Sequence, residues 1–190
     1  SGDYLFDDLY NIVNNSRIQL TSLSWEDMRS VMRSGEAGPL GRPLSVLSFA
    51  LNYYSTGLDP FFFKLTNLLI HLSNTLLVGL LAQVLLIRLL GSRSPRELHA
   101  SRWWAWAVAA LWGLHPLNLT SVLYVVQRMT SLSTLFGLLA LVVYAGRRAR
   151  GDLTTSGATA LSNSLVGGAV AFLLVASVLS KESGLLFVPL

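Results

Sequence analysis

The stretch Leu65–Ile87, LTNLLIHLSNTLLVGLLAQVLLI, is 23 residues long and contains no charged side chain. At about 1.5 Å per residue, a helix of this length crosses the roughly 30 Å hydrocarbon core of a bilayer. Further apolar runs follow, and the predicted spans cover residues 61–88, 103–115, 129–146 and 160–180, with the start of another from 185. The sequence therefore predicts an all-α fold, a polytopic transmembrane helical bundle.

The composition agrees with a membrane protein. Of the 190 residues 52% are hydrophobic and only 13% are charged, whereas soluble domains average about 25% charged residues. The chain has no cysteine, which excludes disulfides, thiolate metal sites and cysteine nucleophiles. Disorder and a water-soluble globule are both disfavoured.

The positions of the charges predict the topology. Residues 1–60 carry a net charge of −3 and the remaining 130 residues a net charge of +7. Most of the later basic residues lie in two short polar stretches between apolar runs: Arg88, Arg93, Arg96 and Arg102, then Arg147, Arg148 and Arg150. The positive-inside rule places both stretches in the cytoplasm, so residues 1–60 form the first extracytoplasmic loop. We expect no nucleic-acid partner, because these charges separate apolar runs and do not cover one wetted face.

The predicted loop contains short amphipathic helices. Ser24–Asp27 is typical of a capping box that starts a helix running to about Arg33. Pro43 suits the first turn of a second helix, where its missing N–H costs nothing. That helix would place Leu44, Leu47 and Leu51 on one face, suited to lie on the membrane surface or to cap the bundle.

Asp7 and Asp8 are the first candidates for chemistry. A carboxylate at the extracytoplasmic surface can act as a general base on an acceptor hydroxyl, and a neighbouring acid raises its basicity. The alternative is a pair of solvated acids that cap a helix over Leu9–Val13. The pair could also bind a divalent cation through oxygen ligands; no other cofactor is expected.

Several cationic and polar residues fall on the same predicted side of the membrane. Lys64, Asn67, His71 and Asn74 form one stripe on the first span, which suits either a polar cavity or hydrogen bonds between helices. Arg42 could clamp a phosphate through two hydrogen bonds or be an ordinary surface arginine. His115, Arg128 and Lys181 stand at the predicted outer ends of spans. Carboxylates and several cations on one outer surface suit a reaction on a lipid-linked phosphate.

Eight short motifs in this order resemble a known family. They are Phe6–Asp8, Arg42–Leu44, Ala50–Tyr53, Gly57–Phe61, Asn67–His71, Leu114–Pro116, Val122–Arg128 and Ser180–Glu182. They are similar to the membrane half of the transmembrane and tetratricopeptide-repeat glycosyltransferases. These belong to the GT-C group, which includes protein O-mannosyltransferases.

The resemblance implies an inverting sugar transfer from a polyprenyl-phosphate donor to a protein or glycan acceptor, often a Ser or Thr hydroxyl. By that resemblance Asp7 is the general base and Asp8 assists it. The residues expected at the lipid phosphate are Arg42, Lys64, His71, His115, Arg128 and Lys181. Lys64 departs from the family pattern, in which a histidine is common at that position.

The resemblance also implies a longer protein, with a repeat domain downstream. The bilayer would be that of a bacterial inner membrane, or of the endoplasmic reticulum in a eukaryote, with the active site on the extracytoplasmic face. Two other functions stay open. A non-catalytic scaffold or accessory subunit predicts dispersed or salt-bridged cations without a cavity, and a transporter predicts inverted repeats with broken helices.

Overall fold

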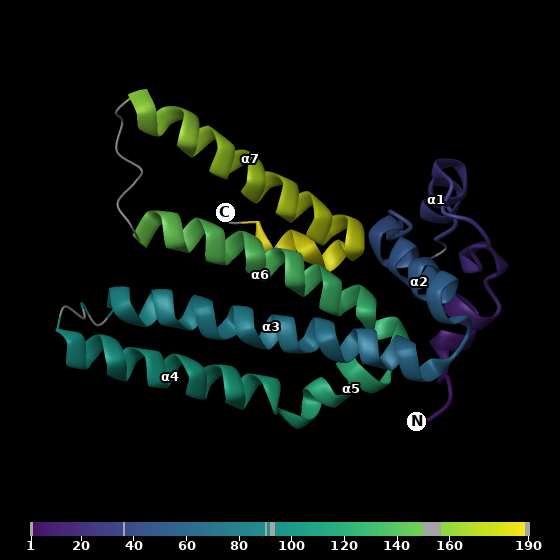
Figure 1. The fold of residues 1–190 in the computed structure, drawn as a ribbon, viewed down its shortest axis with the longest axis horizontal. Helices are drawn as coiled ribbons and strands as arrows, with labels where there is room; N and C mark the ends of the chain where they lie inside the picture. The colour runs from purple at the N-terminus through teal and green to yellow at the C-terminus, as the bar shows by residue number, and fades with distance from the viewer. Residues whose placement is uncertain (1, 36, 90, 92–93, 150–156, 189–190) are drawn as a thin grey trace.

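Four long helices form the body of the molecule in the computed structural model, which describes residues 2–35, 37–89, 91, 94–149 and 157–188. They are α3 (Pro60–Leu89), α4 (Pro95–Gly113), α6 (Arg128–Ala149) and α7 (Gly157–Ser180). Neighbouring helices pack in the order α4, α3, α6, α7, and Figure 1 shows them side by side. Every regular element in the described ranges is helical, which confirms the all-α bundle.

The N-terminal residues fold over one end of this bundle. We call residues 2–56 the N-terminal cap; it contains η1 (Leu9–Val13), η2 (Ser16–Ile18), α1 (Trp25–Met32) and α2 (Pro43–Thr56). At the same end lie the short elements between α4 and α6, and the element after α7 begins there and turns back between α6 and α7 (Figure 1). These are η3 (Pro116–Asn118), α5 (Leu119–Leu123), η4 (Val125–Gln127) and η5 (Glu182–Phe187).

Local sequence determines where the cap helices begin. The Ser24 hydroxyl accepts a hydrogen bond from the Asp27 N–H at 3.1 Å, so α1 starts as predicted. Pro43 occupies the first position of α2, also as predicted. The residue before it, Arg42, has a left-handed backbone with φ 49°, which costs a non-glycine residue conformational energy.

The buried face of α2 is not its leucine face. Val46, Phe49 and Ala50 are buried in the core between the cap and the bundle, whereas Leu51 is 43% exposed. The other side chains of this core come from η1, η2, α1, α3, η4 and the start of α6, and include Ile12, Ile18, Val31, Phe63, Val125 and Met129. This apolar cluster fixes the cap on the bundle.

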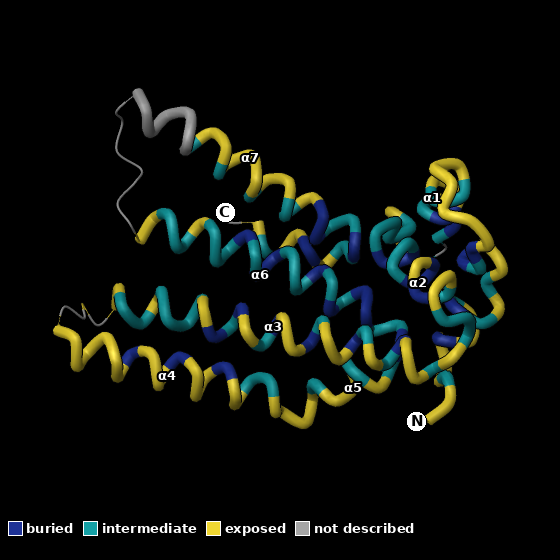
Figure 2. Tube along the Cα trace, in the orientation of Figure 1, coloured by how far each residue is buried: buried dark blue, intermediate teal, exposed yellow. Residues whose placement is uncertain are grey.

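The bundle has the surface of a membrane protein. Large apolar side chains such as Leu69, Leu111 and Phe172 are exposed along the helices, as the exposed stretches in Figure 2 indicate. Within the described residues three helical stretches are long and apolar enough to cross a bilayer: Pro60–Leu89, Val125–Ala149 and Asn163–Ser180. These features are those of an integral membrane protein.

Two elements differ from the sequence-based expectation. The helix expected over 103–115 begins at Pro95, so it includes Arg96, Glu97 and Arg102 in addition to the apolar run. The chain after Ser180 forms the 3-10 helix η5, where the sequence suggested the start of another span from 185.

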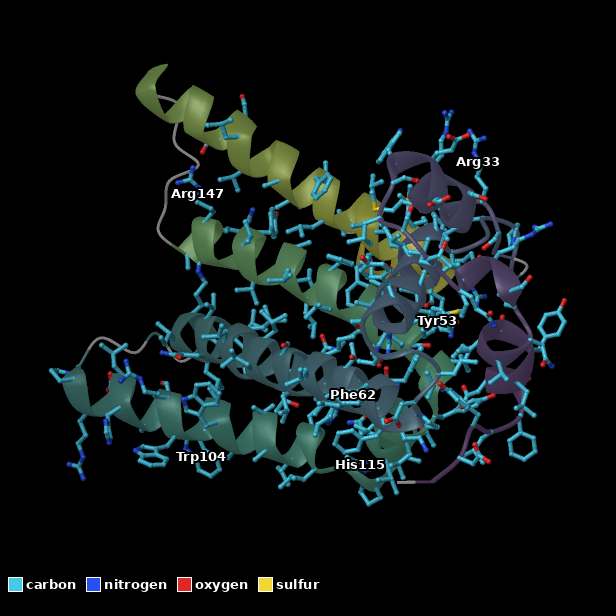
Figure 3. All side chains as sticks on the ribbon, turned by 45° about the vertical axis from the view of Figure 1, so that its right-hand side comes forward. Arg33, Tyr53, Phe62, Trp104, His115 and Arg147 are labelled. Atoms are coloured by element: carbon cyan, nitrogen blue, oxygen red, sulfur yellow. The ribbon has the colours of Figure 1, made fainter. Side chains whose placement is uncertain are left out.

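The described basic residues of the two arginine stretches lie at the end of the bundle opposite the cap. Figure 3 shows this for Arg147, which is far from Arg33 of the cap and from His115. Arg93 and Arg150 lie outside the described residues. The side of the membrane that each end faces stays a prediction.

Candidate functional site

A cavity at the cap end brings together three of the predicted site residues. It has a volume of about 260 Å³, and Asp7, Arg42 and Lys181 line it together with Tyr124 and Gln127. The three come from the segment before η1, the residue before α2 and the residue after α7. The fold thus places one carboxylate and two cations, from distant parts of the chain, around a single hollow.

Arg42 is held by an ion pair in this cavity. Its Nε and Nη2 atoms both lie 2.9 Å from Oε2 of Glu182, and its Nη1 lies 3.4 Å from the Met129 sulfur. A thioether sulfur is a weak acceptor, so the Nη1 group is the part of the guanidinium that can most easily donate a hydrogen bond to a bound anion instead. Glu182 therefore fixes the direction in which Arg42 presents its charge.

Lys181 reaches the same cavity from the neighbouring position. Its Nζ donates a hydrogen bond of 2.7 Å to the Thr130 hydroxyl on α6. Burial, followed by the nearby Arg42 charge, lowers the pKa of the Lys181 amine, while Glu182 opposes the shift. An anion that neutralised Lys181 and Arg42 together would relieve this repulsion.

Asp7 is exposed and lies beside the Tyr124 phenol. The Asp7 N–H donates to the Tyr124 hydroxyl oxygen at 3.2 Å. Burial raises the pKa of Tyr124, and the Asp7 carboxylate raises it further through its hydrogen bond and its negative charge. The hydrogen bond from the Asp7 N–H lowers this pKa but does not outweigh them. Tyr124 therefore stays protonated and can orient the carboxylate.

Asp8 has a different environment from its neighbour. Its side chain is fully buried and accepts hydrogen bonds from the Val126 N–H at 2.7 Å, the Leu5 N–H at 3.1 Å and the Val125 N–H at 3.3 Å. Burial raises the pKa of Asp8, although these three N–H donors oppose the shift. Asp8 joins the N-terminal segment to the chain just before α6 and does not line the cavity. Asp8 occupies the N-cap position of η1, but its side chain makes no capping hydrogen bond there, so it is not the solvated cap of the alternative interpretation.

The structure places Arg128 inside the protein and away from the cavity lining. Its side chain is fully buried. Its Nε donates a hydrogen bond to the Asn67 side-chain oxygen at 2.8 Å. Its Nη2 donates to Asn52 Oδ1 at 2.9 Å and to the Phe63 carbonyl at 2.8 Å. Its guanidinium carbon lies 4.9 Å from the centre of the Phe49 ring. These protein groups use the donors that a phosphate would need, so the contacts give Arg128 a structural role.

The polar stripe of α3 also faces the bundle interior. Asn67 Nδ2 donates to the Tyr124 and Val125 carbonyls, both at 3.3 Å, and Asn74 Nδ2 donates to the Ser131 carbonyl at 3.0 Å. His71 Nε2 lies 2.9 Å from the Gly113 carbonyl. These contacts are the interhelical hydrogen bonds of the structural alternative.

The remaining predicted phosphate ligands lie elsewhere. His71 and His115 line a separate, largely apolar groove of about 460 Å³ between α3, α4 and α5. His115 is exposed and accepts a hydrogen bond from the Leu117 N–H at 3.3 Å, which caps η3. Lys64 Nζ donates to the carbonyls of Gly2 and Asp3. None of the three lines the Asp7 cavity.

A divalent cation held by both carboxylates of the pair does not fit this geometry. The Asp8 oxygens already accept three backbone hydrogen bonds, and the described residues contain no group of three or more His, Cys, Asp or Glu side chains arranged to hold a metal.

Several residues that line the cavity or contact its cations had no role assigned from the sequence. Tyr124 and Gln127 lie within the motif Val122–Arg128. Within this motif, a role was assigned from the sequence only to Arg128. Thr130, which holds Lys181, looks like any polar residue at a helix start. Glu182 follows Lys181 in the sequence and forms its ion pair with Arg42.

The fold and this cavity define a helical integral membrane protein with a charged hollow at one end of its bundle. Human protein O-mannosyl-transferase TMTC4 (Homo sapiens) is 35% identical over 149 residues, covering 75% of this chain and 20% of that protein. Protein O-mannosyl-transferase Tmtc3 of Drosophila melanogaster is 32% identical over 194 residues, covering 95% of this chain and 20% of that protein. Protein O-mannosyl-transferase TMTC1 of Mus musculus is 30% identical over 149 residues, covering 75% of this chain and 14% of that protein.

The chain is thus a relative of the TMTC protein O-mannosyl-transferases, which confirms the resemblance drawn from the ordered motifs. It spans about a fifth or less of the length of these curated relatives. No family model matches the chain, and no solved structure matches it.

Proposed function

We propose that this chain carries the reaction site of a membrane glycosyltransferase that acts on proteins. The sugar passes from a polyprenyl-phosphate donor to a Ser or Thr hydroxyl, with inversion at the anomeric carbon. The observation that carries the proposal is the cavity shared by Asp7, Arg42 and Lys181. The printed names of the relatives make mannose the first sugar to test.

In the proposed reaction the acceptor oxygen attacks the anomeric carbon, and its proton passes to the Asp7 carboxylate. A bond forms between that oxygen and the anomeric carbon while the bond from the carbon to the phosphate oxygen breaks. The polyprenyl phosphate leaves as an anion. Arg42 and Lys181 stabilise the charge that develops on it, which is the contribution that fixed cations make to transfer reactions.

Tyr124 and Asp8 act as positioning residues in this mechanism. The Tyr124 hydroxyl lies against the Asp7 backbone N–H, and Asp8 ties residues 125 and 126 to the same N-terminal segment. The two contacts together hold the Asp7 carboxylate at the cavity. Asp8 is therefore expected to affect stability and Asp7 geometry, and not to exchange a proton with the acceptor.

The test is transfer by the complete protein in proteoliposomes, with polyprenyl-phosphate mannose and a Ser/Thr peptide. Asp7→Asn removes the base and should lower kcat by roughly 10²–10⁴-fold without lowering the melting temperature. Asp3→Asn is the matched control, since it neutralises an exposed acid of the same segment. Full activity of Asp7→Asn would overturn the assignment of the base.

A non-catalytic scaffold remains the second candidate. It is favoured by the burial of Arg128 among protein acceptors and by the pairing of Arg42 with Glu182. The cavity that Asp7 lines favours the enzyme. A scaffold would transfer no sugar from any polyprenyl-phosphate donor, whereas its membrane insertion would be normal.

A further inference from the structure

A second hollow continues from the Asp7 cavity across the N-terminal cap. It has a volume of about 210 Å³, and it shares Asn11, Ala37 and Met129 with the lining of the Asp7 cavity. Three asparagines line it, and we call them the asparagine wall: Asn11, Asn14 and Asn15. The two hollows are therefore neighbours, with Asn11 at their junction.

The asparagine wall offers hydrogen-bonding groups of both kinds. Asn11 Nδ2 donates to the Asp7 carbonyl at 2.9 Å, and Asn15 Oδ1 accepts from the Arg17 N–H at 3.1 Å, so these two side chains are fixed. Asn14 is exposed, and its side chain makes no hydrogen bond within the described part of the chain. A side-chain amide pairs equally well with the N–H and the C=O of an extended polypeptide.

A third hollow extends this path onto α1. Its volume is about 380 Å³; it shares Arg17 with the asparagine hollow, and its other lining residues are Glu26, Arg29, Ser30 and Arg33. We call Arg17, Arg29 and Arg33 the arginine cluster. Arg29 lies in α1, and Arg33 follows four residues later as the C-cap of that helix. All three are exposed, and no ion pair joins them to an acid in the ranges that the structure describes.

The position of α1 indicates what the arginine cluster faces. Figure 1 shows α1 beyond the ends of the long helices. Figure 3 shows Arg33 on the outside of the cap. This location suits a water-exposed polypeptide better than the surface of a bilayer.

We infer that the acceptor polypeptide lies along these three adjoining hollows, with its hydroxyl at Asp7, its backbone on the asparagine wall and acidic side chains at the arginine cluster. The inference rests on the proposed function and adds the acceptor class, which is an acidic protein segment. The hollow on α1 carries three positive charges against one negative charge, so it attracts an anionic partner.

The experiment compares three acceptor peptides that differ only in residues flanking one Ser: glutamate, glutamine or lysine. The unmodified protein should show a kcat/KM about fivefold higher for the glutamate peptide than for the lysine peptide at low salt, with the difference shrinking at high salt. The double variant Arg29→Glu/Arg33→Glu should prefer the lysine peptide, and Arg29→Gln/Arg33→Gln should show no preference. The glutamine peptide should react equally well with all three proteins.

The asparagine wall is tested separately. Asn14→Ala should raise the KM for all three peptides severalfold while the KM for the polyprenyl-phosphate donor stays constant. Thr21→Ala is the control, because Thr21 is exposed and lines none of the three hollows, and it should leave the KM for all three peptides unchanged.

The outcomes separate this inference from the proposed function. Transfer that depends on Asp7 but shows equal kcat/KM for the three peptides would overturn the inference alone. If the protein transferred sugar from none of the donors, both the proposed function and this inference would be overturned. The double variant Arg29→Glu/Arg33→Glu could change only the binding to vesicles that contain phosphatidylglycerol and leave the peptide preference unchanged. That result would assign the arginine cluster to the membrane surface and would also overturn the inference.

Discussion

Arg42 and Glu182 are 140 residues apart in the sequence and form an ion pair of 2.9 Å that joins the start of α2 to the segment after α7. Their side chains are 21% and 25% exposed, so water screens the pair only partly. Arg42 adopts a left-handed backbone here. The ion pair therefore connects the N-terminal cap to the far end of the chain and orients a cation at the cavity.

Glu182→Gln should destabilise the protein at neutral pH by up to about 1 kcal/mol, the usual upper value for a partly exposed pair. Burial works to raise the pKa of Glu182, but backbone N–H groups and the Arg42 guanidinium outweigh it and lower the pKa below the ordinary 4.5. A lowered carboxyl pKa stabilises the fold above about pH 4.5, and that stability is lost as the pH falls through the lowered pKa.

The measurement for Glu182→Gln is the melting temperature in detergent between pH 7 and pH 3. The difference in melting temperature between the variant and the unmodified protein should disappear toward pH 3. Glu26→Gln, at an exposed position of α1, is the control and should show no such convergence. A constant difference at every pH would contradict the ion-pair explanation.

Arg128→Met should lower the free energy of unfolding by about 3 kcal/mol or more. It removes the donors to Asn52, Asn67 and the Phe63 carbonyl, and a buried acceptor left unpaired costs about 1–3 kcal/mol. Arg128→Lys should restore only part of the loss, because an ammonium cannot reproduce the guanidinium fork. Unfolding in detergent measures the effect. A lysine variant with unchanged stability but a raised donor KM would instead support the phosphate-binding role expected from the sequence.

Lys181→Arg should shift the alkaline limit of transfer to higher pH. Burial and the Arg42 charge lower the pKa of Lys181, so its amine loses its proton below the ordinary 10.5. The amine binds phosphate only when charged, and affinity for the donor therefore falls as the pH rises through that lowered pKa. A guanidinium stays charged throughout this range. The donor KM measured from pH 7 to pH 10 checks the prediction, and identical profiles for both proteins would contradict it.

Gly184→Ala should destabilise the protein by about 1–3 kcal/mol, the usual cost of overpacking. A Cβ at this position would lie 2.5 Å from the Ser177 carbonyl carbon, which is helix backbone and cannot yield easily. Gly146→Ala on α6 is the matched control, since its added Cβ meets no atom within 4 Å. Thermal unfolding should show a lower melting temperature for the first variant and an unchanged or higher one for the second. Equal effects would contradict the proposed packing.

The fold class follows from simple features of the sequence. The charge-free run Leu65–Ile87 demands a helix, because no other structure satisfies its backbone groups within a bilayer. Capping residues such as Ser24 and the position of Pro43 act within one helical turn, so they too can be recognised locally. The two uses expected for the leucine face of α2, lying on the membrane or capping the bundle, could not be separated from the sequence, because periodicity shows which residues share a face and not which face meets the core.

The site was only partly predictable. The sequence nominated Asp7, Arg42 and Lys181, and they share one cavity. It also nominated Arg128 and Asp8, which are buried and bonded to protein groups. A charge looks the same in a sequence whether water, a substrate or the protein itself satisfies it, so this distinction requires the partners to be known.

The sequence by itself determined that this protein is a helical membrane bundle related to the TMTC protein O-mannosyl-transferases. Hydrophobic length and the order of motifs are properties of the chain alone. Only the tertiary structure decided which charges face a hollow, that Glu182 pairs with Arg42, and that three hollows lead from Asp7 to Arg29 and Arg33. These depend on contacts between distant segments, which packing around the core of Phe49, Phe63 and Val125 brings together.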